Sequence, residues 1–597
     1  LLSNGYQKDN RNNINTTLRL NYDLSSLLTK GLSVHGSIAY DSYYYSRKKY
    51  SKTFPYYLAR RDAEDPDYIY LIPQSEESIW SVSTGWDKNR KVYMEFGIDY
   101  NRTFGLHKTT ALILYNQSKY YSPSLQYYVP NAYQGLVGRL TYEYASRYLA
   151  EFNMGYNGTE NFAKGKRFGF FPAVSLGWVI SEEKFFPKNN IVKYLKVRGS
   201  YGEVGNDQIG GDRFLYLPSS YGAASDSGVN KYNFGLASNP YTSLMIVENK
   251  IGNPDLTWEK AKKMNVGVDI NLFNNCLTAS FDIFKEKRNN ILANRSTSPM
   301  IIGANLPAYN FGEMENRGWE MDLNFRHHIQ DFHYWARFNY SFARNEIIYM
   351  DEVQKRYDYQ MTTGRRKNQF FGLIFDGYYN SWEEINALDC PKSSWSGNQL
   401  QPGDVKYVDV NQDGVIDDYD MVPIGYTPVP EIIYGFSFGA QYKGFDFSIL
   451  FQGADNVSIK YFGRSMWPFA KGEESAKSLI KERWTQERSE AGEKITFPRL
   501  SLNPNGETDH NYRPSTLWIR DASYLRLKNL EVGYTFTGGF VKRLNLNSVR
   551  LYFNGSNLFT WTDVVDLDPE APSRSGNVEI NTYPLQKVYN IGLNINF

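Results

Sequence analysis

The feature that most constrains this chain is a succession of long segments in which apolar and polar residues alternate. The last segment is the clearest: its polar face is Asn590, Gly592, Asn594 and Asn596, and its apolar face is Tyr589, Ile591, Leu593, Ile595 and Phe597. A half-buried strand in a water-soluble sheet also alternates, but it usually runs about five or six residues. These segments run about nine to eleven residues, the span of a tilted strand that crosses a bilayer.

The same pattern recurs along the whole chain and predicts about 17 strands, with boundaries uncertain by about two to four residues. The segments lie near residues 13–22, 32–40, 91–100, 110–116, 136–144, 148–156, 173–180, 195–201, 262–272, 277–285, 318–326, 332–342, 432–442, 445–453, 522–536, 549–557 and 589–597. We therefore predict an all-β fold.

The connections between these segments alternate between short and long. Tight links at 145–147, 273–276, 327–331 and 443–444 are separated by long ones at 41–90, 202–261, 286–317, 343–431, 454–521 and 558–588. Alternation of this kind is typical of an up-and-down transmembrane barrel, with short periplasmic turns at one end and long extracellular loops at the other. A sandwich or a propeller has no reason to maintain it.

The polar faces of the segments carry charged residues, namely Arg139, Glu143, Glu151, Asp269, Asp282, Asp322 and Arg326. An Arg or Lys that faces lipid at the bilayer midplane costs about 2–4 kcal/mol. We therefore expect these faces to line a wet or protein-filled interior. A barrel with so many strands is too wide for its side chains to fill, which predicts a channel or an internal plug.

The composition excludes several other classes of protein. The 66 basic and 64 acidic residues leave a net charge of +2, which argues against a nucleic-acid binder. No stretch approaches the roughly 18 apolar residues of a membrane-spanning helix. Two cysteines in 597 residues exclude a disulfide-stapled scaffold. Aromatic residues make up 16% of the chain, which suits strands with amphipathic rings at membrane boundaries.

The odd number of predicted strands bears on where the chain starts. Outer-membrane barrels normally have an even number of strands. Counting back from Phe597 at the periplasmic rim predicts that the first strand here descends from the outside. Because the chain also opens without Met or a signal peptide, we expect an N-terminal part of the protein to lie outside this sequence.

Five stretches carry a family resemblance. They are residues 153–178, 252–272, 403–453, 517–536 and 549–572, and they include the segments GDVKYVDVNQDGVIDDYD and LWIRDASYLRLKNLEVGYTF. In sequence and order they resemble the SusC-like (SusC/RagA) family of TonB-dependent outer-membrane transporters of Bacteroidetes. The resemblance covers most of the chain.

The resemblance implies a 22-stranded barrel in the outer membrane of a Gram-negative cell, of which residues 1–597 supply about 17 strands. It also implies an N-terminal plug and a TonB box, neither in this chain. A SusD-like surface lipoprotein would form a lid over the extracellular mouth, and pairs of barrel and lid can associate as dimers. The implied activity is TonB-dependent import of a large polar nutrient, with oligosaccharide favoured over peptide.

One acidic segment fits the spacing of a twelve-residue calcium loop. Gly414 would supply the sharp turn, and Ca²⁺ would be held by oxygens of Asp409, Asn411, Asp413, Val415 (through its carbonyl), Asp417 and Asp420. Position twelve is Asp rather than the bidentate Glu, so the cage would be looser. The alternative is an Asx-rich turn held by its own side-chain-to-backbone bonds. Either way we expect a structural role.

Other motifs give weaker signals. Phe597 ends an alternating strand, and together with Tyr589, Ile591, Leu593 and Ile595 it resembles the signal that the barrel-assembly machinery reads. Pairs of aromatic residues such as Tyr127-Tyr128 and Trp467-Phe469 could stack on sugars, although the interfacial aromatic girdle or loop packing is the favoured interpretation.

No catalytic residue is expected, because the sequence has no HExxH, GxSxG or phosphate-binding Gly-Lys-Ser/Thr motif. Two alternatives to import stay open. One is a secreted or surface adhesin or glycan-processing enzyme, which would be soluble without detergent. The other is a passive porin, which would lack the lid lipoprotein.

Overall fold

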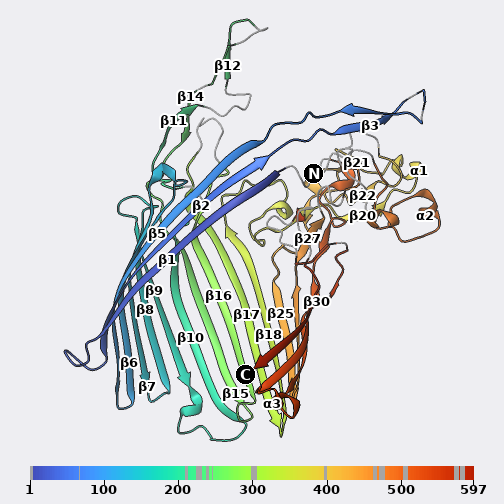
Figure 1. Cartoon of the computed structure of the whole chain (residues 1–597). Helices are drawn as coiled ribbons and strands as arrows, with labels where there is room; N and C mark the ends of the chain where they lie inside the picture. The colour runs from blue at the N-terminus through green and yellow to red at the C-terminus, as the bar shows by residue number, and fades with distance from the viewer. Residues whose placement is uncertain are drawn as a thin grey trace. The chain divides into compact units, whose positions relative to one another are not determined.

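The computed structural model covers the chain (Figure 1) and describes residues 5–62, 64–65, 67–208, 213–223, 231–236, 241–244, 246–297, 306–395, 400–461, 467–469, 478–501, 509–565, 567–570, 577–578 and 585–597. Within these ranges, no helix is both long enough and apolar enough to cross a membrane. Seventeen strands make up one large antiparallel sheet, as the alternation predicts.

The chain divides into two compact units, which are described separately. Unit 1 comprises residues 1–145, 149–174 and 205–258, and unit 2 comprises residues 146–148, 175–204 and 259–597. The boundary falls within three strands of the sheet, β8 (Tyr148–Thr159), β9 (Phe168–Val179) and β10 (Val192–Asn206).

Unit 1 contains five strands in a continuous antiparallel ladder. They are β1 (Gly5–Asp23), β2 (Leu32–Ser51), β5 (Ser81–Phe104), β6 (His107–Tyr121) and β7 (Asn131–Tyr144), and each pairs with the next along the chain. Its long connections form three small hairpins: β3 (Tyr57–Arg61) with β4 (Ile69–Pro73), β11 (Ser219–Ala223) with β14 (Ile246–Lys250), and β12 (Lys231–Phe234) with β13 (Tyr241–Leu244).

Unit 2 contains a longer ladder of the same kind. It runs through β15 (Glu259–Leu272), β16 (Leu277–Ala293), β17 (Tyr309–Ile329), β18 (Phe332–Tyr349), β25 (Ile432–Tyr442), β26 (Phe445–Asp455), β29 (Tyr524–Phe536), β30 (Ser548–Thr562) and β32 (Val588–Asn596). Every pairing joins neighbouring strands of the large sheet, which is the up-and-down order.

The long connections of unit 2 are folded. Their short strands are β19 (Phe371–Gly372), β20 (Phe375–Tyr378), β21 (Lys392–Ser393), β22 (Val405–Tyr407), β23 (Val415–Ile416), β24 (Val422–Pro423), β27 (Ser458–Tyr461), β28 (Ile519–Asp521) and β31 (Asn577–Val578). Their helices are α1 (Trp382–Ile385) and α2 (Gln486–Glu490), and α3 (Phe540–Arg543) lies in a connection at the other end of the strands. Single 3-10 turns occur at Gln126–Tyr128, Ile180–Glu182, Asp358–Gln360, Asp418–Asp420, Ser478–Glu482 and His510–Tyr512.

The short connections are tight turns. At the link between β25 and β26, Lys443 (φ 44°) and Gly444 (φ 92°) both have left-handed backbone. Turns of this type match the right-handed twist of the flanking strands. Asn274 and Asn275 (φ 56° and 67°) make the link between β15 and β16 in the same way, and asparagine tolerates this conformation better than most residues.

The strands are longer than the alternation predicts. In the large sheet they run from 9 residues in β32 to 24 residues in β5. The extra length lies mostly at the ends that meet the long loops; β5, for example, begins at Ser81 rather than near residue 91. Those ends carry polar or charged residues on both faces, as Asp87 and Lys88 do in β5, so the alternation from which the strand ends were predicted is weaker there.

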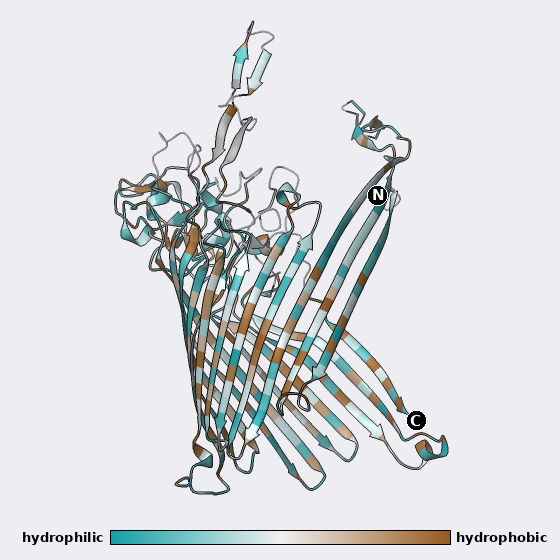
Figure 2. Cartoon of the chain, turned by 90° about the vertical axis from the view of Figure 1, so that its left-hand side faces the viewer, coloured by the Kyte–Doolittle hydropathy of each residue, from teal (hydrophilic) through white to brown (hydrophobic). Residues whose placement is uncertain are grey.

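Hydrophilic and hydrophobic residues alternate along the long strands (Figure 2). Because side chains of a strand point alternately to the two sides of a sheet, this alternation gives the strands one apolar and one polar face. The register of the pairing places apolar residues mostly opposite apolar ones and polar residues mostly opposite polar ones on neighbouring strands. In β32, Ile591 lies opposite Phe553 and Leu593 lies opposite Leu551, whereas Asn590 lies opposite Asn554. The two faces therefore extend across neighbouring strands as continuous surfaces.

Candidate functional site

The apolar face is not covered by any other part of the chain that the structure describes. Ile591 is 81% exposed and Leu593 56% exposed, and neither lies beneath a second sheet. Contiguous apolar surface of this extent is uncommon on a soluble monomer and marks contact with a membrane or a partner. The alternative of a soluble β-sandwich core is therefore excluded for this strand.

The polar face of unit 2 carries an ion-pair network centred on Arg198 in β10. Its guanidinium donates to both carboxylate oxygens of Asp282 at 2.6 and 2.7 Å, and to both of Asp269 at 3.1 and 3.2 Å. Bidentate pairs of this kind fix both direction and distance. Asp269 and Asp282, predicted to face the interior, therefore lie together on the polar face, with Arg198 as the unpredicted partner.

A second network on the same face joins β26, β29 and β30. Arg550 donates to Asp446 and, at 2.6 Å, to Glu531. In unit 1, Arg139 donates to Glu151 at 3.2 Å. Arg139, Glu143, Glu151, Asp269 and Asp282, which the sequence predicts to face the interior, are thus paired with opposite charges. Asp322 and Arg326 lie on the polar face of β17, opposite Asn339 and Trp335.

A pocket of about 330 Å³ opens on the polar face of unit 2, where β16, β17 and β18 meet the loop that ends at Glu431. Its lining mixes charged and polar residues with apolar ones and consists of Glu286, Arg288, Met314, Glu315, Asn316, Ala343, Asn345, Lys367, Thr427, Val429, Pro430 and Glu431. The Glu286 carboxylate forms ion pairs with Arg288 (2.8 Å) and Lys263 (3.2 Å). Among the described residues, the Lys367 ammonium and the Asn316 amide have no hydrogen-bond partner. These two groups are free to bind a solute.

Glu431 anchors one wall of this pocket. It is 5% exposed, accepts from Arg344 at 2.8 and 3.0 Å, and pairs with Arg366. Burial alone would raise the pKa of Glu431, but the two guanidinium groups hold it below its ordinary value. The carboxylate therefore stays charged and holds the loop against the strand ends.

The long loops of unit 2 share a hydrophobic core, which we call the loop core. Its buried residues are Leu373, Val405, Tyr407, Ile416, Val457, Ile459, Tyr461, Trp467, Phe497, Tyr512, Leu517, Trp518, Ala522 and Val564. Trp467 is thus a packing residue, in agreement with the favoured interpretation of the loop aromatics. Tyr128, by contrast, is 81% exposed. The sequence analysis missed the loop core because its residues are scattered through three loops without periodicity.

A buried histidine spans this core. His510 Nε2 lies 2.7 Å from the Val405 carbonyl and Nδ1 lies 2.8 Å from the Ser393 hydroxyl. A neutral ring that donates from Nε2 and accepts at Nδ1 satisfies both partners. Burial lowers the pKa of His510, so the neutral form is the native one.

The acidic loop 409–420 is held by bonds to its own backbone. Asp409 accepts from the N–H groups of Gln412 and Gly414 at 2.7 and 2.8 Å. Asp420 is fully buried and accepts from Val410 and Asp417, each at 2.9 Å. Burial raises the pKa of Asp420 despite these N–H groups. Such bonds are those of the Asx-rich turn considered as the alternative to a calcium loop.

The same loop keeps one feature of a cation site. Parallel pairing with Lys392–Ser393 uses the carbonyls of Gly414 and Ile416, so the Val415 carbonyl points to the opposite side, as position seven of a calcium loop requires. Within the described residues, no group of three or more His, Cys, Asp or Glu side chains is arranged to hold a metal ion. Calcium binding by Asp409, Asn411, Asp413, Val415, Asp417 and Asp420 stays a prediction.

The C-terminal strand has the geometry expected of its sequence. Tyr589, Ile591, Leu593 and Ile595 all lie on the apolar face of β32. Phe597 is 87% exposed, and its carbonyl accepts from the Asn547 side chain. Recognition of these residues by an assembly machinery stays a prediction.

Together, the uncovered apolar face, the ion-paired polar face and the up-and-down order define a protein that crosses a membrane with β-strands. A family profile described as TonB dependent receptor-like, beta-barrel, matches residues 1–558. The chain belongs to this family, and it is a transmembrane β-barrel protein of the outer membrane.

Individual relatives agree with this assignment. The chain is 29% identical to TonB-dependent receptor P3 of Formosa agariphila over 479 residues, which are 77% of this chain and 45% of that protein. It is 28% identical to TonB-dependent receptor SusC of Bacteroides thetaiotaomicron over 477 residues, 79% of this chain and 44% of that protein. The chain thus spans about half the length of the curated relatives it matches.

Among solved structures, the chain is similar to one described as the structure of the RagAB peptide transporter. The TM-score is 0.72 with 20% identity, and the match covers 99% of this chain and 62% of that one. At this identity the likeness shows the fold alone. It agrees with the SusC/RagA resemblance of the sequence.

Proposed function

We propose that the chain is the barrel portion of a TonB-dependent importer that takes up a large polar nutrient together with a SusD-like lid lipoprotein. The polar face would line the path of the substrate, and TonB would act through a part of the protein outside this sequence. Binding and gating would be its chemistry, with no catalytic residue involved. Membership of the TonB-dependent receptor-like family and the likeness to SusC support this proposal.

The observation that carries the proposal is the pocket on the polar face. Paired charges make its wall rigid, while Lys367 and Asn316 keep unused hydrogen-bonding groups. A site with few free polar groups and no free carboxylate suits a neutral, hydroxyl-rich solute. We therefore favour oligosaccharide as the substrate class. Peptide is the alternative, since the solved structure of similar fold is described as a peptide transporter.

The test is uptake by cells that carry the full-length protein. Fluorescently labelled oligosaccharides and peptides of equal size would be compared, with and without an uncoupler of the proton-motive force. We expect uncoupler-sensitive uptake of oligosaccharide and co-purification of a lipoprotein. Uptake that ignores the uncoupler would instead indicate a passive pore.

Two variants locate the path within the barrel. Lys367→Gln combined with Asn316→Leu should reduce uptake about tenfold, because each lost hydrogen bond to substrate weakens binding by about 0.5–1.5 kcal/mol. The matched control is Lys443→Gln, in the short turn between β25 and β26, which should leave uptake unchanged.

A further inference from the structure

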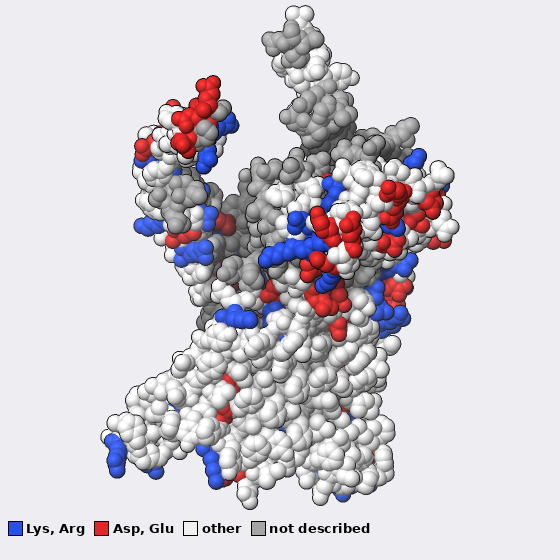
Figure 3. Space-filling view, turned by 90° about the vertical axis from the view of Figure 1, so that its right-hand side faces the viewer, with Lys and Arg blue, Asp and Glu red and all other residues white. Residues whose placement is uncertain are grey.

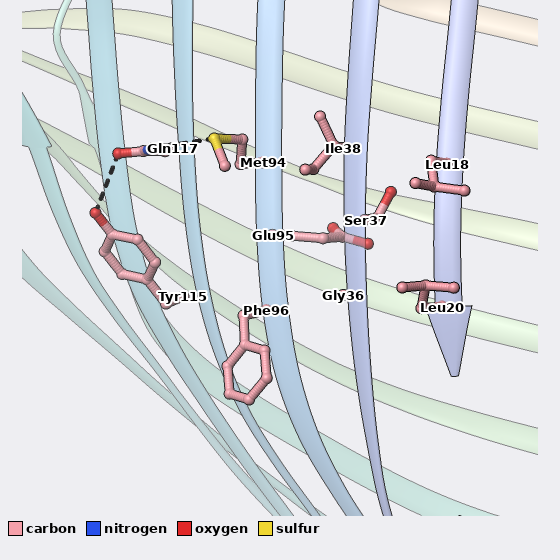
Figure 4. Close-up of a pocket in the computed structure, with 10 residues that line it drawn as sticks. All are labelled: Leu18, Leu20, Gly36, Ser37, Ile38, Met94, Glu95, Phe96, Tyr115 and Gln117. Carbon is pink, nitrogen blue, oxygen red and sulfur yellow. Dashed lines mark hydrogen bonds between the residues drawn. The ribbon is translucent and has the colours of Figure 1, made fainter. Parts of the chain in front are cut away.

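The apolar face of unit 1 is interrupted by a groove at Gly36 in β2. Its volume is about 290 Å³, and Figure 4 shows the surrounding side chains, from four adjacent strands. Leu20, Ile38, Met94 and Phe96 supply apolar walls. The floor is open because Gly36 has no side chain: a Cβ placed there would meet only the Glu95 carbonyl oxygen, at 3.9 Å.

Register places the groove on the lipid-facing side of the sheet. Leu20, Gly36, Phe96 and Tyr115 are directly opposite one another across β1, β2, β5 and β6. The row next to it is Leu18, Ile38, Met94 and Gln117. An apolar groove on this face meets hydrocarbon, so its natural occupant is an acyl chain.

Three cations lie on the same face, nearer the long loops. Lys119 is opposite Val92, Arg90 is opposite Tyr121, and Lys88 is opposite Tyr44. All three cations are exposed, and the Arg90 guanidinium lies 4.6 Å from the centre of the Tyr121 ring. Tyrosine side chains in these rows mark the level of the lipid headgroups.

Among the described residues of β1, β2, β5 and β6, no acidic side chain is paired with these cations. Asp41, Asp87 and Glu95 are at intervening positions of β2 and β5, so they face the polar side. In the part of the chain that the structure describes, Lys88, Arg90 and Lys119 form no ion pair. Their charge is thus available to an anion from outside the protein.

The depth of the groove matches the level of the cations. Six residues separate Phe96 from Arg90 along β5, or about 20 Å at the rise of a strand. With a tilt of about 40° this is about 15 Å of depth, which is half of the roughly 30 Å hydrocarbon core. A lipid whose headgroup meets Arg90 would therefore bring its acyl chain into the groove.

We propose that this surface, formed by the Gly36 groove with Lys88, Arg90 and Lys119, binds a phosphate-bearing lipid of the outer leaflet. The phosphate would pair with the three cations, and one acyl chain would fill the groove. We call it the lipid surface. It is independent of the transported substrate, because it lies on the apolar face of unit 1 and not on that unit's polar face.

Unit 2 supplies a matched control. Its apolar face is also followed by three lysines, but each has a carboxylate: Lys285 with Glu315 at 2.9 Å, Lys287 with Glu313 at 2.9 Å and Lys262 with Glu203 at 3.9 Å. These lysines are already neutralised by the protein. Removing them should not change the binding of an anionic lipid.

The test uses the full-length protein in detergent, titrated with bisphosphorylated lipid A and followed by native mass spectrometry. Lys88→Gln, Arg90→Gln and Lys119→Gln combined should weaken binding at least tenfold. The same three changes at Lys262, Lys285 and Lys287 should alter it less than twofold. Equal losses in both triple variants would overturn the proposal, since binding would then reflect net charge alone.

Two further measurements separate the parts of the site. Gly36→Leu fills the groove without touching a charge and should weaken lipid A binding about tenfold; unchanged binding would refute the acyl-chain contact. Inorganic phosphate should bind at least a hundredfold more weakly than lipid A, and comparable affinity would show that a free anion, not a lipid, is the ligand.

Folding of each variant is checked by migration of unheated samples in SDS gels. If the triple variant does not fold, Arg90→Gln alone should weaken binding about threefold, and no loss would count against the proposal.

Discussion

The two basic surfaces on the lipid-facing side of the sheet differ in how their charge is balanced. In unit 2, Lys285 and Lys287 are met by glutamates on the next strand. In unit 1, Lys88, Arg90 and Lys119 are surrounded by tyrosines and an open groove. Basic residues just beyond the apolar band are thus paired with carboxylates in unit 2 and have no such partner in unit 1. A basic side chain indicates an anion-binding surface only where no neighbouring carboxylate already pairs with it.

Unit 2 pairs its charges elsewhere as well. In Figure 3 the charged side chains on the face in view gather over the long connections, with acidic and basic groups intermixed, and the strand surface below them carries few. Arg317 is exposed and lies between Lys285 and Arg344 in register, with Glu315 two positions away on the same face. The predictions below test how far internal pairing accounts for the behaviour of unit 2.

The largest expected effect comes from the most buried pair of unit 2. Arg526, with a side chain 3% exposed, donates to Asp568 at 2.6 Å and Glu570 at 2.5 Å. Arg526→Met leaves the buried Asp568 without its cationic partner and Glu570 with Lys528 alone, and the free energy of unfolding should fall by about 3–5 kcal/mol. Urea unfolding in detergent, followed by tryptophan fluorescence, measures it. Lys528→Met removes a more exposed partner of Glu570 and should cost less than about 1 kcal/mol; equal losses would contradict the argument.

Adding calcium tests whether the acidic loop is held by its own hydrogen bonds alone or also binds a cation. We expect Ca²⁺ at a hundredfold excess over its dissociation constant to stabilise the protein by about 2.7 kcal/mol, measured as a rise in melting temperature. Asp409→Asn should abolish the rise, and Asp389→Asn, outside the acidic loop but in the same long connection between β18 and β25, should not. If neither calcium nor magnesium shifts the melting temperature, the Asx-turn bonds account for the loop alone.

Acid tests the buried imidazole of His510, which contacts the loop-core residue Val405. Because the pKa of His510 is lower in the folded protein than in the unfolded chain, the unfolded state binds the proton more readily. Its contribution to stability is therefore complete above about pH 6.5 and is lost as the pH falls below that value. Between pH 7.5 and 5.5 the loss should be about 1 kcal/mol. His510→Gln should remove this pH dependence, whereas His333→Gln, at an exposed position near the start of β18, should retain it.

The smallest effect on stability accompanies a gain of binding. Glu313→Gln and Glu315→Gln combined would leave Lys285 and Lys287 unpaired, as the cations of unit 1 are. Stability should change by less than about 1 kcal/mol, since exposed ion pairs contribute little. Lipid A binding should increase about threefold. No increase would mean that the groove, and not the unpaired charge, makes unit 1 different.

Much of the sheet could be predicted from the sequence, because alternation records which side chains face lipid. Each of the seventeen predicted segments corresponds to one strand of the large sheet to within two residues beyond its ends, and the segment 432–442 agrees with β25 at both ends. The same pattern placed Asp269 and Asp282 on the polar face. It could not supply Arg198 as their partner, because their meeting depends on register between strands about 70 residues apart in sequence.

The loops could not be predicted in the same way. Their structure rests on contacts such as that between His510 and Val405, 105 residues apart, and no local pattern records such a pairing. The lipid surface was missed for a related reason. Gly36 reads as an ordinary strand residue, and only the register of β1, β2, β5 and β6 shows that it opens a groove beside unbalanced cations.

The loop core has a consequence for how the protein is made. Its side chains come from three successive loops, represented by Leu373, Tyr512 and Val564, and pairs of crossing strands separate those loops in the chain. The segments can meet only after β25, β26, β29 and β30 have all passed through the bilayer. If one hairpin failed to insert, the apolar side chains of its loop would stay exposed to water. The loop core therefore forms only when all of these strands are inserted.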